Sequence, residues 1–436
     1  MKRRRSYPIT AVVMAAAIGV TLTACSSGGS SSASSTTSSS SSSAKSIPTQ
    51  GVTSSEIHIG VPWVNFEALK SIGVNINHGN YVEAYTALIN HQNAQGGING
   101  RMIIPTFVPV NPASSTDPAT SCAQLTQDDK VFVSFQPVYA TCYLNAGVST
   151  IGGTYGTGAT SNGAQNFNLT PPQAVLDPLI VKALGTSRFK GKKVAIYAGS
   201  TTDAVDLSQV KADIIAQGAK VVATGTNTAP AGDQAATNQQ FSVIAEKFQS
   251  AGANLVVALG SGSSGWPTGL VDDQISYNPS WIAMESDTVI AYAQGATASP
   301  SHLTNMFTLA ASIDQTDMWT TAAIQDCASI VKAAYPNDEM VTTGNASTDT
   351  TYVSVVQACQ FLSLFTQIAD AAGKNLTANS FIQAGYGLKD ITIPGFPGTL
   401  SFGPNQPYAI GDLYPGTYDT TTKLVVVSTT PYSSGS

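Results

Sequence analysis

The residues most suggestive of chemistry form a glycine-rich segment at 260–265, Gly-Ser-Gly-Ser-Ser-Gly, directly after an apolar run at 255–259. Glu285 lies twenty residues beyond its last glycine. A strand, a G-x-G-x-x-G loop and a following acid form a dinucleotide-binding fingerprint, in which the loop approaches a pyrophosphate and the acid binds a ribose. The fingerprint needs a helix that runs on from the third glycine, and Pro267 and Gly269 predict that this helix is broken. An NAD-dependent enzyme is therefore kept only as a distant alternative.

Other patterns for catalysis or metal binding are weak. No G-x-S-x-G occurs, and 152–156 has only its outline, with threonine in the place of the nucleophile. The adjacent acids Asp128-Asp129 and Asp272-Asp273 would point in different directions on a helix, which predicts solvated charges. There is no C-x-x-C, and the four histidines are scattered. We expect no catalytic residue, no metal and no cofactor.

The N-terminus has the pattern of an export signal. Basic residues at 2–5 precede an apolar stretch at 9–20, and Leu-Thr-Ala-Cys at 22–25 closes it. This resembles a bacterial lipobox, so we expect a lipoprotein signal peptide over 1–24 and a diacylglycerol on Cys25. The alternative is an ordinary secretory signal with an incidental cysteine.

A flexible tether is expected over 25–50, because residues 26–46 hold fourteen serines and cannot bury a core. No later apolar run reaches the length of a membrane helix. The sequence thus predicts a body exported and lipid-anchored to the outer face of the cytoplasmic membrane.

Composition limits the class of protein. Loss of the four basic residues at 2–5 with the signal changes the net charge from −6 to −10, which argues against nucleic acid as a partner. With 42% hydrophobic and 11% charged residues, the body is not intrinsically disordered. Its length of about 385 residues predicts two domains.

Four cysteines remain if Cys25 is acylated, and an even number suits an oxidising compartment. Three pairings are possible. We favour Cys122 with Cys142 and Cys327 with Cys359, because each pair closes a short local loop; four buried thiols are the alternative.

Strand and helix patterns alternate through most of the body. Strands are expected at 56–61, 102–108, 193–197, 221–223 and 255–259, with amphipathic helices between them. This alternation predicts parallel sheets covered on both faces, with ligands bound beyond the carboxyl ends of the strands. From 391 onward, Pro, Gly, Tyr and Thr predict short strands with turns.

Several segments carry a family resemblance: G-V-T-S-S-E-I-H-I-G at 51–60, N-A-Q-G-G-I-N-G-R at 93–101, G-K-K-V-A at 191–195, A-G-A-N at 251–254 and G-T-L-S-F at 398–402. Together they resemble type I periplasmic substrate-binding proteins of the branched-chain amino-acid class. The resemblance implies an α/β fold of two lobes, each a doubly wound parallel sheet, joined by three crossovers. It also implies a small-molecule ligand in the cleft, an ABC-type permease as partner and a monomer.

The resemblance places the crossovers near 170–172, 307–312 and 402–406. The N-terminal lobe would then comprise 51–171 plus 308–402, and the C-terminal lobe 172–307 plus 403–436.

By the family's layout, ligand contacts come from loops that follow strands in both lobes. The expected residues are Trp63, Asn77, His78, Gln136, Tyr139, Thr141, Thr154, Tyr155, Thr202, Asp203, Ser261, Trp266, Glu285 and Asp287. Hydroxyls and free amides at a helix start suit a ligand carboxylate, aromatic rings its apolar part, and an acid its ammonium. The alternatives are that Trp63 and Tyr139 cap the sheet and that Glu285 is a solvated loop residue.

The chain departs from amino-acid binders, which usually carry a Ser-Ala-Thr type loop in the first lobe and an aromatic-Gly pair in the second. Here these positions hold Gly153-Thr154-Tyr155 and Asp203-Ala204-Val205. We therefore expect a small polar or amphipathic solute, an amino acid or a related compound, that contacts at least one of Trp63, Tyr139 and Tyr155. A lipid-anchored sensor that presents its closed form to a receptor is the alternative to transport, and neighbouring genes would separate the two.

Overall fold

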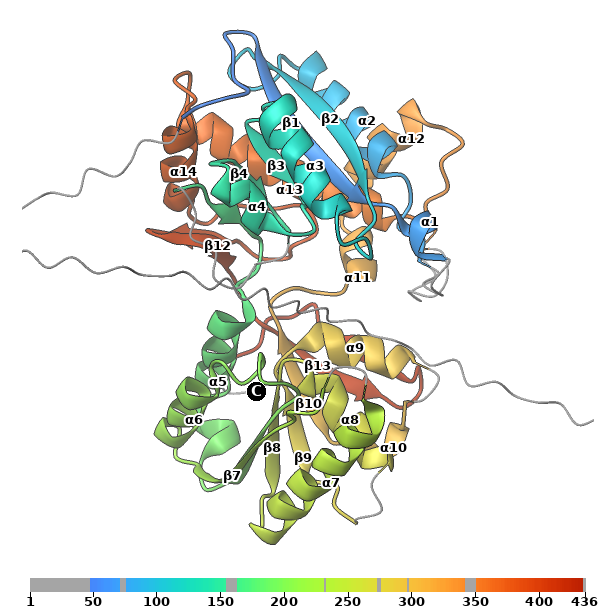
Figure 1. Ribbon diagram of the computed structural model, residues 1–436, viewed down its shortest axis with the longest axis vertical. Coiled ribbons are helices and arrows are strands. Elements are labelled where there is room, and N and C mark those ends of the chain that lie inside the picture. The colour runs from blue at the N-terminus through green and yellow to red at the C-terminus, as the bar shows by residue number, and fades with distance from the viewer. Residues whose placement is uncertain are drawn as a thin grey trace, which may run out of the picture.

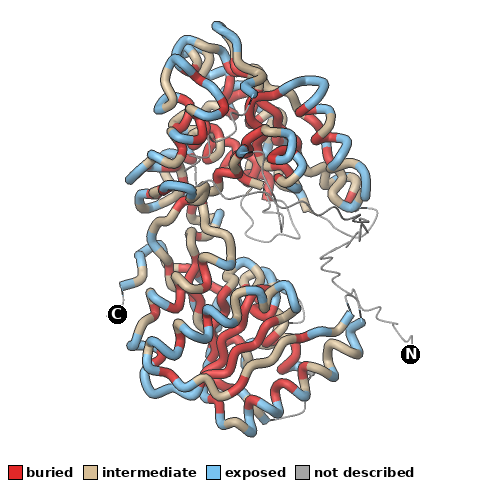
Figure 2. The backbone as a smooth tube through the Cα atoms, turned by 60° about the vertical axis from the view of Figure 1, so that its left-hand side comes forward, coloured by how far each residue is buried: buried red, intermediate tan, exposed pale blue. Residues whose placement is uncertain are grey.

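The computed structural model describes residues 48–70, 76–153, 163–230, 233–272, 276–295, 298–341 and 350–433. Cys25, Thr154 and Tyr155 lie outside the described residues. The described chain folds into two lobes stacked along the long axis of the molecule (Figure 1). Buried residues concentrate in the middle of each lobe, so each has its own core (Figure 2).

Lobe 1, the upper lobe in Figure 1, is built on a parallel five-stranded sheet in the order β2-β1-β3-β4-β5. Its first elements are β1 (Glu56–Val64), α1 (Phe66–Leu69), α2 (Tyr81–Ala94), β2 (Met102–Val110), α3 (Asp117–Ala123), the π-helix η2 (Gln124–Asp128), β3 (Val133–Phe135), α4 (Ala140–Asn145), β4 (Ser149–Ile151) and β5 (Asn166–Phe167). The chain later returns to add α11 (Gln315–Trp319), α12 (Ala322–Ala334), α13 (Val353–Ala372), α14 (Ala378–Gly387), β11 (Ser401–Gly403) and β12 (Gln406–Ile410).

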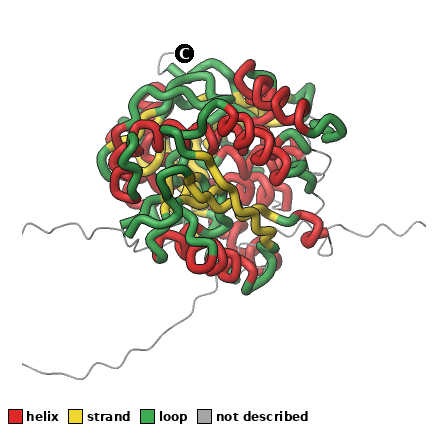
Figure 3. The backbone as a smooth tube through the Cα atoms, turned by 90° about the horizontal axis from the view of Figure 1, so that it is seen from above, coloured by secondary structure: helices red, strands yellow, loops and turns green. Residues whose placement is uncertain are grey.

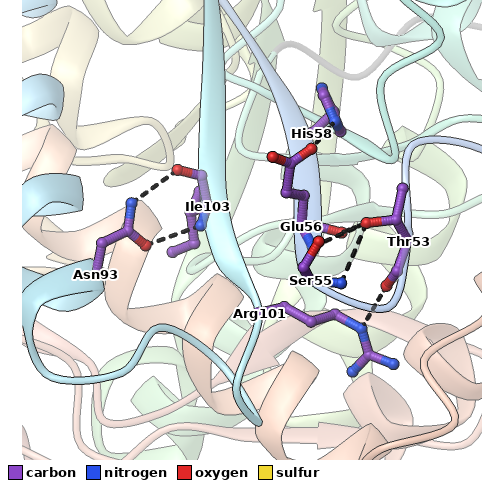
Figure 4. Close-up of polar contacts among 7 residues, drawn as sticks. All are labelled: Thr53, Ser55, Glu56, His58, Asn93, Arg101 and Ile103. Atoms are coloured by element: carbon purple, nitrogen blue, oxygen red, sulfur yellow. Dashed lines mark hydrogen bonds and ion pairs between the residues drawn. The ribbon is translucent and has the colours of Figure 1, made fainter.

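Two segments that carry the family resemblance, 51–60 and 93–101, make hydrogen bonds that connect neighbouring elements of this lobe (Figure 4). The Asn93 amide, on α2, donates to Ile103 O at 2.9 Å and accepts from Ile103 N at 2.8 Å, which fixes the helix to β2. The Arg101 Nε donates to Thr53 O at 2.7 Å, and Thr53 Oγ1 in turn accepts from the backbone N–H of Glu56. These residues act on the fold, and none of them lines the cleft described below.

Lobe 2 contains a seven-stranded sheet in the order β14-β13-β10-β9-β8-β6-β7. Its elements are α5 (Gln173–Phe189), β6 (Lys193–Ala198), α6 (Leu207–Ala216), β7 (Lys220–Thr226), α7 (Gln234–Ser250), β8 (Leu255–Leu259), α8 (Gly262–Asp272), β9 (Ser280–Ala283), α9 (Ser286–Gln294), α10 (Pro300–Leu303), β10 (Met306–Ala310), β13 (Tyr414–Asp419) and β14 (Leu424–Val427). Viewed down the long axis, with lobe 1 nearest the viewer, helices lie around the central strands (Figure 3). The sheet is parallel from β7 to β10, but β13 and β14 pair antiparallel, so it is mixed at one edge.

The chain passes between the lobes three times; the second passage overlaps its expected position, and the third begins later than expected. The first follows β5, within 168–172. The second follows Ala310, because residues 308–310 still pair with β9 and β13 in lobe 2. The third follows Ile410, because β12 pairs with β11 and bridges Asn168 beside β5. In the structure the second and third passages begin after Ala310 and Ile410, a few residues beyond the expected boundaries at 307/308 and 402/403.

The glycine-rich segment corrects two further expectations. Helix α8 does run on from it, through Pro267, where a break was expected. Trp266 is fully buried and its ring packs against Tyr197, Phe241 and Phe248, so it belongs to the core of lobe 2 and not to a ligand site. This packing stabilises the helix enough to offset the hydrogen bond that a proline cannot make.

Both expected disulfides are present and are confirmed by the structure. Cys122–Cys142 joins α3 to α4, and Cys327–Cys359 joins α12 to α13. Both lie within lobe 1, so they stabilise that lobe without restraining its movement against lobe 2. Among the described residues, no helix has the length and apolar character needed to cross a membrane.

Candidate functional site

A cleft of about 510 Å³ lies between the lobes, with walls from both lobes and from two passages. Lobe 1 contributes residues of α13 and of the segment just before it, from Thr350. Lobe 2 contributes one face of α9, and the passages contribute residues near 168–170 and 312–316. The lining includes His78, Asp287, Ile290, Asp314, Tyr352, Gln357, Phe361 and Phe396. The parallel strands explain this position, since β5 leaves lobe 1 and β10 leaves lobe 2 at their carboxyl ends, which face each other.

The lobe 1 wall is held by a network of neutral hydrogen bonds. Gln357 Oε1 accepts from the Tyr81 hydroxyl at 2.7 Å and from Gln136 Nε2 at 2.8 Å. The Tyr85 hydroxyl donates to Gln136 Oε1 at 2.9 Å, and His78 Nδ1 lies 3.2 Å from the Tyr81 oxygen. Gln136 therefore does not line the cleft, but it orients Gln357, which does.

The direction of these bonds fixes what the wall offers to a ligand. Because the Tyr81 hydroxyl donates to Gln357, its oxygen can accept from His78 Nδ1–H. His78 Nε2 is then left as an acceptor, and Gln357 Nε2 as a donor. Burial lowers the pKa of His78 to about 4, so the imidazole is neutral at physiological pH. The wall is polar but carries no positive charge.

The facing edge of lobe 2 is acidic. Glu285 occupies the N-cap position of α9, two residues after β9, and its side chain makes no capping hydrogen bond. Burial, followed by the charges of Asp203 and Asp287, raises its pKa to about 7. Asp177 is buried in α5, and burial together with the neighbouring carboxyl of Asp206 raises its pKa. Gln173 holds this buried acid, since its amide donates both to Asp177 and, at 2.8 Å, to Met284 O.

Two acids line the cleft itself. Asp287 belongs to the first turn of α9; part of its surface is exposed, but the surrounding protein removes hydration and raises its pKa. Burial, followed by the charges of Asp317 and Asp287, raises the pKa of Asp314 to about 6. Burial and the Asp314 charge raise the pKa of Tyr352 to about 12. Carboxyl groups thus extend from the edge of lobe 2 into the cleft, and a positive charge bound beside them would favour their ionised form.

Comparison with protein-family models gives no match, and no curated protein matches the chain by sequence. Solved structures do match it. A solute-binding protein of an R. palustris ABC transporter, in complex with 4-hydroxybenzoate, is 14% identical with a TM-score of 0.59, covering 87% of this chain and 97% of its own. A type 1 periplasmic binding protein from Bordetella pertussis Tohama I is 14% identical with a TM-score of 0.56, covering 86% and 100%. This chain has the type I periplasmic-binding-protein fold.

A third structure with the type I fold is the substrate-binding protein of a branched-chain amino acid transporter from Streptococcus pneumoniae, in complex with isoleucine. It is 16% identical with a TM-score of 0.51, covering 86% of this chain and 99% of its own. At such identities the likeness establishes the fold, and the nature of the ligand must be inferred from this chain's own residues.

The structure separates the expected ligand residues of this type I fold into groups. His78 and Asp287 line the cleft, and Gln136 supports it through Gln357. Trp63 is partly buried against the core of lobe 1 and does not line the cleft, so its contact with a ligand stays a prediction. Tyr139 is 49% exposed at the start of α4.

The remaining expected residues lie away from the cleft lining. Asn77 shapes the loop before α2, since its side chain accepts from Gly79 N and its carbonyl from Thr350 N. Thr141 is half-buried in α4, and Thr202 and Ser261 are exposed on loops at the carboxyl edge of lobe 2. Their contact with a ligand stays a prediction.

The surroundings of the glycine-rich loop at 260–265 do not suit a phosphate, although its sequence has the dinucleotide-binding spacing. Ser261 Oγ donates to Asp203 Oδ2 at 2.5 Å, and a Cβ added at Gly260 would lie 2.3 Å from Asp203 Oδ1. A carboxylate therefore lies against the loop before α8, where a pyrophosphate would have to bind. The charge of Asp203 opposes a dinucleotide more directly than Pro267 does.

Sequence inspection missed Asp314, Gln357, Phe361 and Phe396. Asp314 lies in the second passage, and Phe396 in a loop that follows α14. Gln357 shares α13 with other polar residues such as Gln360 and Gln367, so nothing in the sequence distinguished it. Among the described residues, no group of three or more His, Cys, Asp or Glu side chains is placed to hold a metal ion.

Proposed function

We propose that this chain is an extracytoplasmic solute-binding protein that captures a small molecule between its lobes and delivers it to an ABC-type permease. The observation that carries the proposal is the cleft of about 510 Å³ with walls from both lobes and two passages. This volume falls within the roughly 300–1,000 Å³ of small-molecule sites. Because the ligand would contact both lobes, its binding energy favours the arrangement in which both walls reach it.

The export and anchoring of this protein belong to the same proposal. The lipobox and the serine-rich tether favour a lipid anchor at Cys25, and two disulfides favour an oxidising compartment outside the cytoplasmic membrane. Intact-mass measurement of the chain purified from membranes tests the anchor. We expect a mature chain that begins at a diacylated Cys25, and an unmodified Cys25 thiol on a processed chain would exclude it.

A thermal-shift screen of the purified full chain tests solute capture. The library should span amines, amides, carboxylates, amino acids, aromatic acids and sugars. We expect at least one class to raise the melting temperature, since a ligand at a hundred times its Kd adds about 2.7 kcal/mol to the stability of the folded state. If no class does so, or if a stabilising compound is chemically converted, the proposal is wrong.

A further inference from the structure

We infer that the solute held between the lobes is an organic cation with an apolar body, such as a protonated amine. The inference rests on the proposed function and specifies the chemical class of its ligand. It is carried by three properties of the cleft: its charge, the absence of neutralising partners for that charge, and the apolar surface beside it.

The cleft carries two carboxylates and no basic residue. Asp287 lies on the wall from lobe 2 and Asp314 in the second passage, and no Lys or Arg belongs to the described lining. The sequences of 71–75, 154–162 and 342–349 contain no Lys or Arg either. His78 on the opposite wall is neutral, because burial lowers its pKa. A ligand with a net negative charge would find no opposite charge in the described cleft.

Among the described residues, no basic side chain pairs with either acid. In the described part of the chain, the salt bridges are Glu56 with His58 and Glu67 with Lys70, and both lie in lobe 1 away from the cleft lining. Asp314 accepts a backbone hydrogen bond from Val427, but no base neutralises it. Carboxylates crowded together without a counter-charge destabilise the ligand-free protein, and a bound cation would relieve that repulsion.

An inorganic metal ion does not fit this site. A divalent cation such as Ca²⁺ takes about six to eight oxygen ligands, whereas the described acids nowhere converge in a group able to hold a metal. A protonated amine needs only one or two acceptors, and it gains charge-assisted hydrogen bonds from carboxylates. The charge pattern therefore favours an organic cation.

The rest of the cleft suits the apolar body of such a ligand. The rings of Phe361, Phe396 and Tyr352 line the lobe 1 side, and Ile290 lies one turn along α9 from Asp287. Aromatic rings bind an apolar group through their faces, and they also attract an amine within about 6 Å of the ring centre. The acid and the apolar side chain on one face of α9 thus match the two halves of an amphipathic amine.

A charge-matched panel tests the inference in the full chain. The probes are phenethylamine and tryptamine, the neutral N-acetyl form of each, and the carboxylates 3-phenylpropionate and indole-3-propionate. We expect at least one amine to raise the melting temperature and to bind by calorimetry, and its neutral and anionic counterparts to bind at least tenfold more weakly. If no amine binds, or if a carboxylate binds as tightly as its amine, the inference is overturned. The proposed function would still stand if a compound of another class stabilised the chain.

Substitutions at the two acids test whether the charge acts where we place it. We expect Asp287→Asn and Asp314→Asn each to weaken binding of the amine at least tenfold, and to leave weak binding of its N-acetyl form unchanged. The matched control is Asp326→Asn on the exposed side of α12, which should bind the amine as the unaltered chain does. Circular dichroism and melting temperature establish that each variant is folded. Unchanged amine affinity in both folded cleft variants would overturn the inference.

Discussion

Replacement of Glu285 by glutamine should change how the stability of the protein depends on pH. Burial, with help from Asp203 and Asp287, raises the pKa of this acid from 4.5 to about 7 in the folded state. Between these values the folded protein binds a proton that the unfolded chain has lost. The contribution of Glu285 to stability is therefore greatest below pH 4.5 and is lost as the pH rises to 7.

The size of this effect follows from the pKa difference. A difference of about 2.5 corresponds to about 3.4 kcal/mol at most. Glu285 is only half-buried, so solvent screening reduces the value, and we expect roughly 1.5 kcal/mol. Glutamine keeps the shape of the side chain and has no charge to acquire.

Urea unfolding at pH 5 and pH 8 measures the effect. Glu285→Gln and the unaltered chain should have similar free energies of unfolding at pH 5, and the variant should be more stable by roughly 1.5 kcal/mol at pH 8. Glu246→Gln on the exposed side of α7 is the control and should follow the unaltered chain at both pH values. If Glu285→Gln and the unaltered chain lose stability in parallel between pH 5 and pH 8, the raised pKa assigned to Glu285 from its burial and from the neighbouring charges is wrong.

Three further substitutions test the fold that positions the cleft. Gln357→Leu leaves the Tyr81 hydroxyl and the Gln136 amide without their acceptor, so it should lower the free energy of unfolding by about 1–3 kcal/mol and weaken solute binding. An unchanged solute affinity would contradict the role of this hydrogen-bond network in the cleft wall. Gly79 has a φ of +85°, and a Cβ added there would lie 2.1 Å from a backbone oxygen, whereas Gly96 has a φ of +103° and open space around it. Gly79→Ala should therefore lower the melting temperature more than Gly96→Ala does, and equal melting temperatures would refute this. Replacing Cys327 and Cys359 together by alanine opens a link across 32 residues and should lower stability by about 3.7 kcal/mol in urea unfolding, whereas a loss below about 1 kcal/mol would contradict the loop-entropy account.

Local patterns were sufficient to predict much of the fold. Strand and helix periodicity identified the alternating elements, and the spacing of the cysteines identified both disulfides, because these features depend on residues close in sequence. The motif residues Asn93 and Arg101 were informative for the same reason, since they fix neighbouring elements of lobe 1.

Features set by distant contacts could not be predicted. The second and third passages begin where β10 and β12 stop pairing, and the pairing of β10 with β13 and the bridge from β12 to Asn168 join residues far apart in the chain. Trp266 was expected in the site because it lies in the segment that follows the strand at 255–259, but aromatic residues from other elements enclose it. Asp314 and Gln357 line the cleft only because the chain returns to lobe 1 after β10.

A distance measurement between the lobes tests the central claim most directly. Spectroscopic labels introduced as unnatural amino acids at Ala323 of α12 and Val243 of α7 would report the separation, since both residues are exposed and lie in different lobes. With the amine that gives the largest thermal shift, we predict that the distance distribution moves to shorter values as the sites fill. Saturation confirmed by calorimetry with no change in the distance distribution would contradict capture by lobe closure.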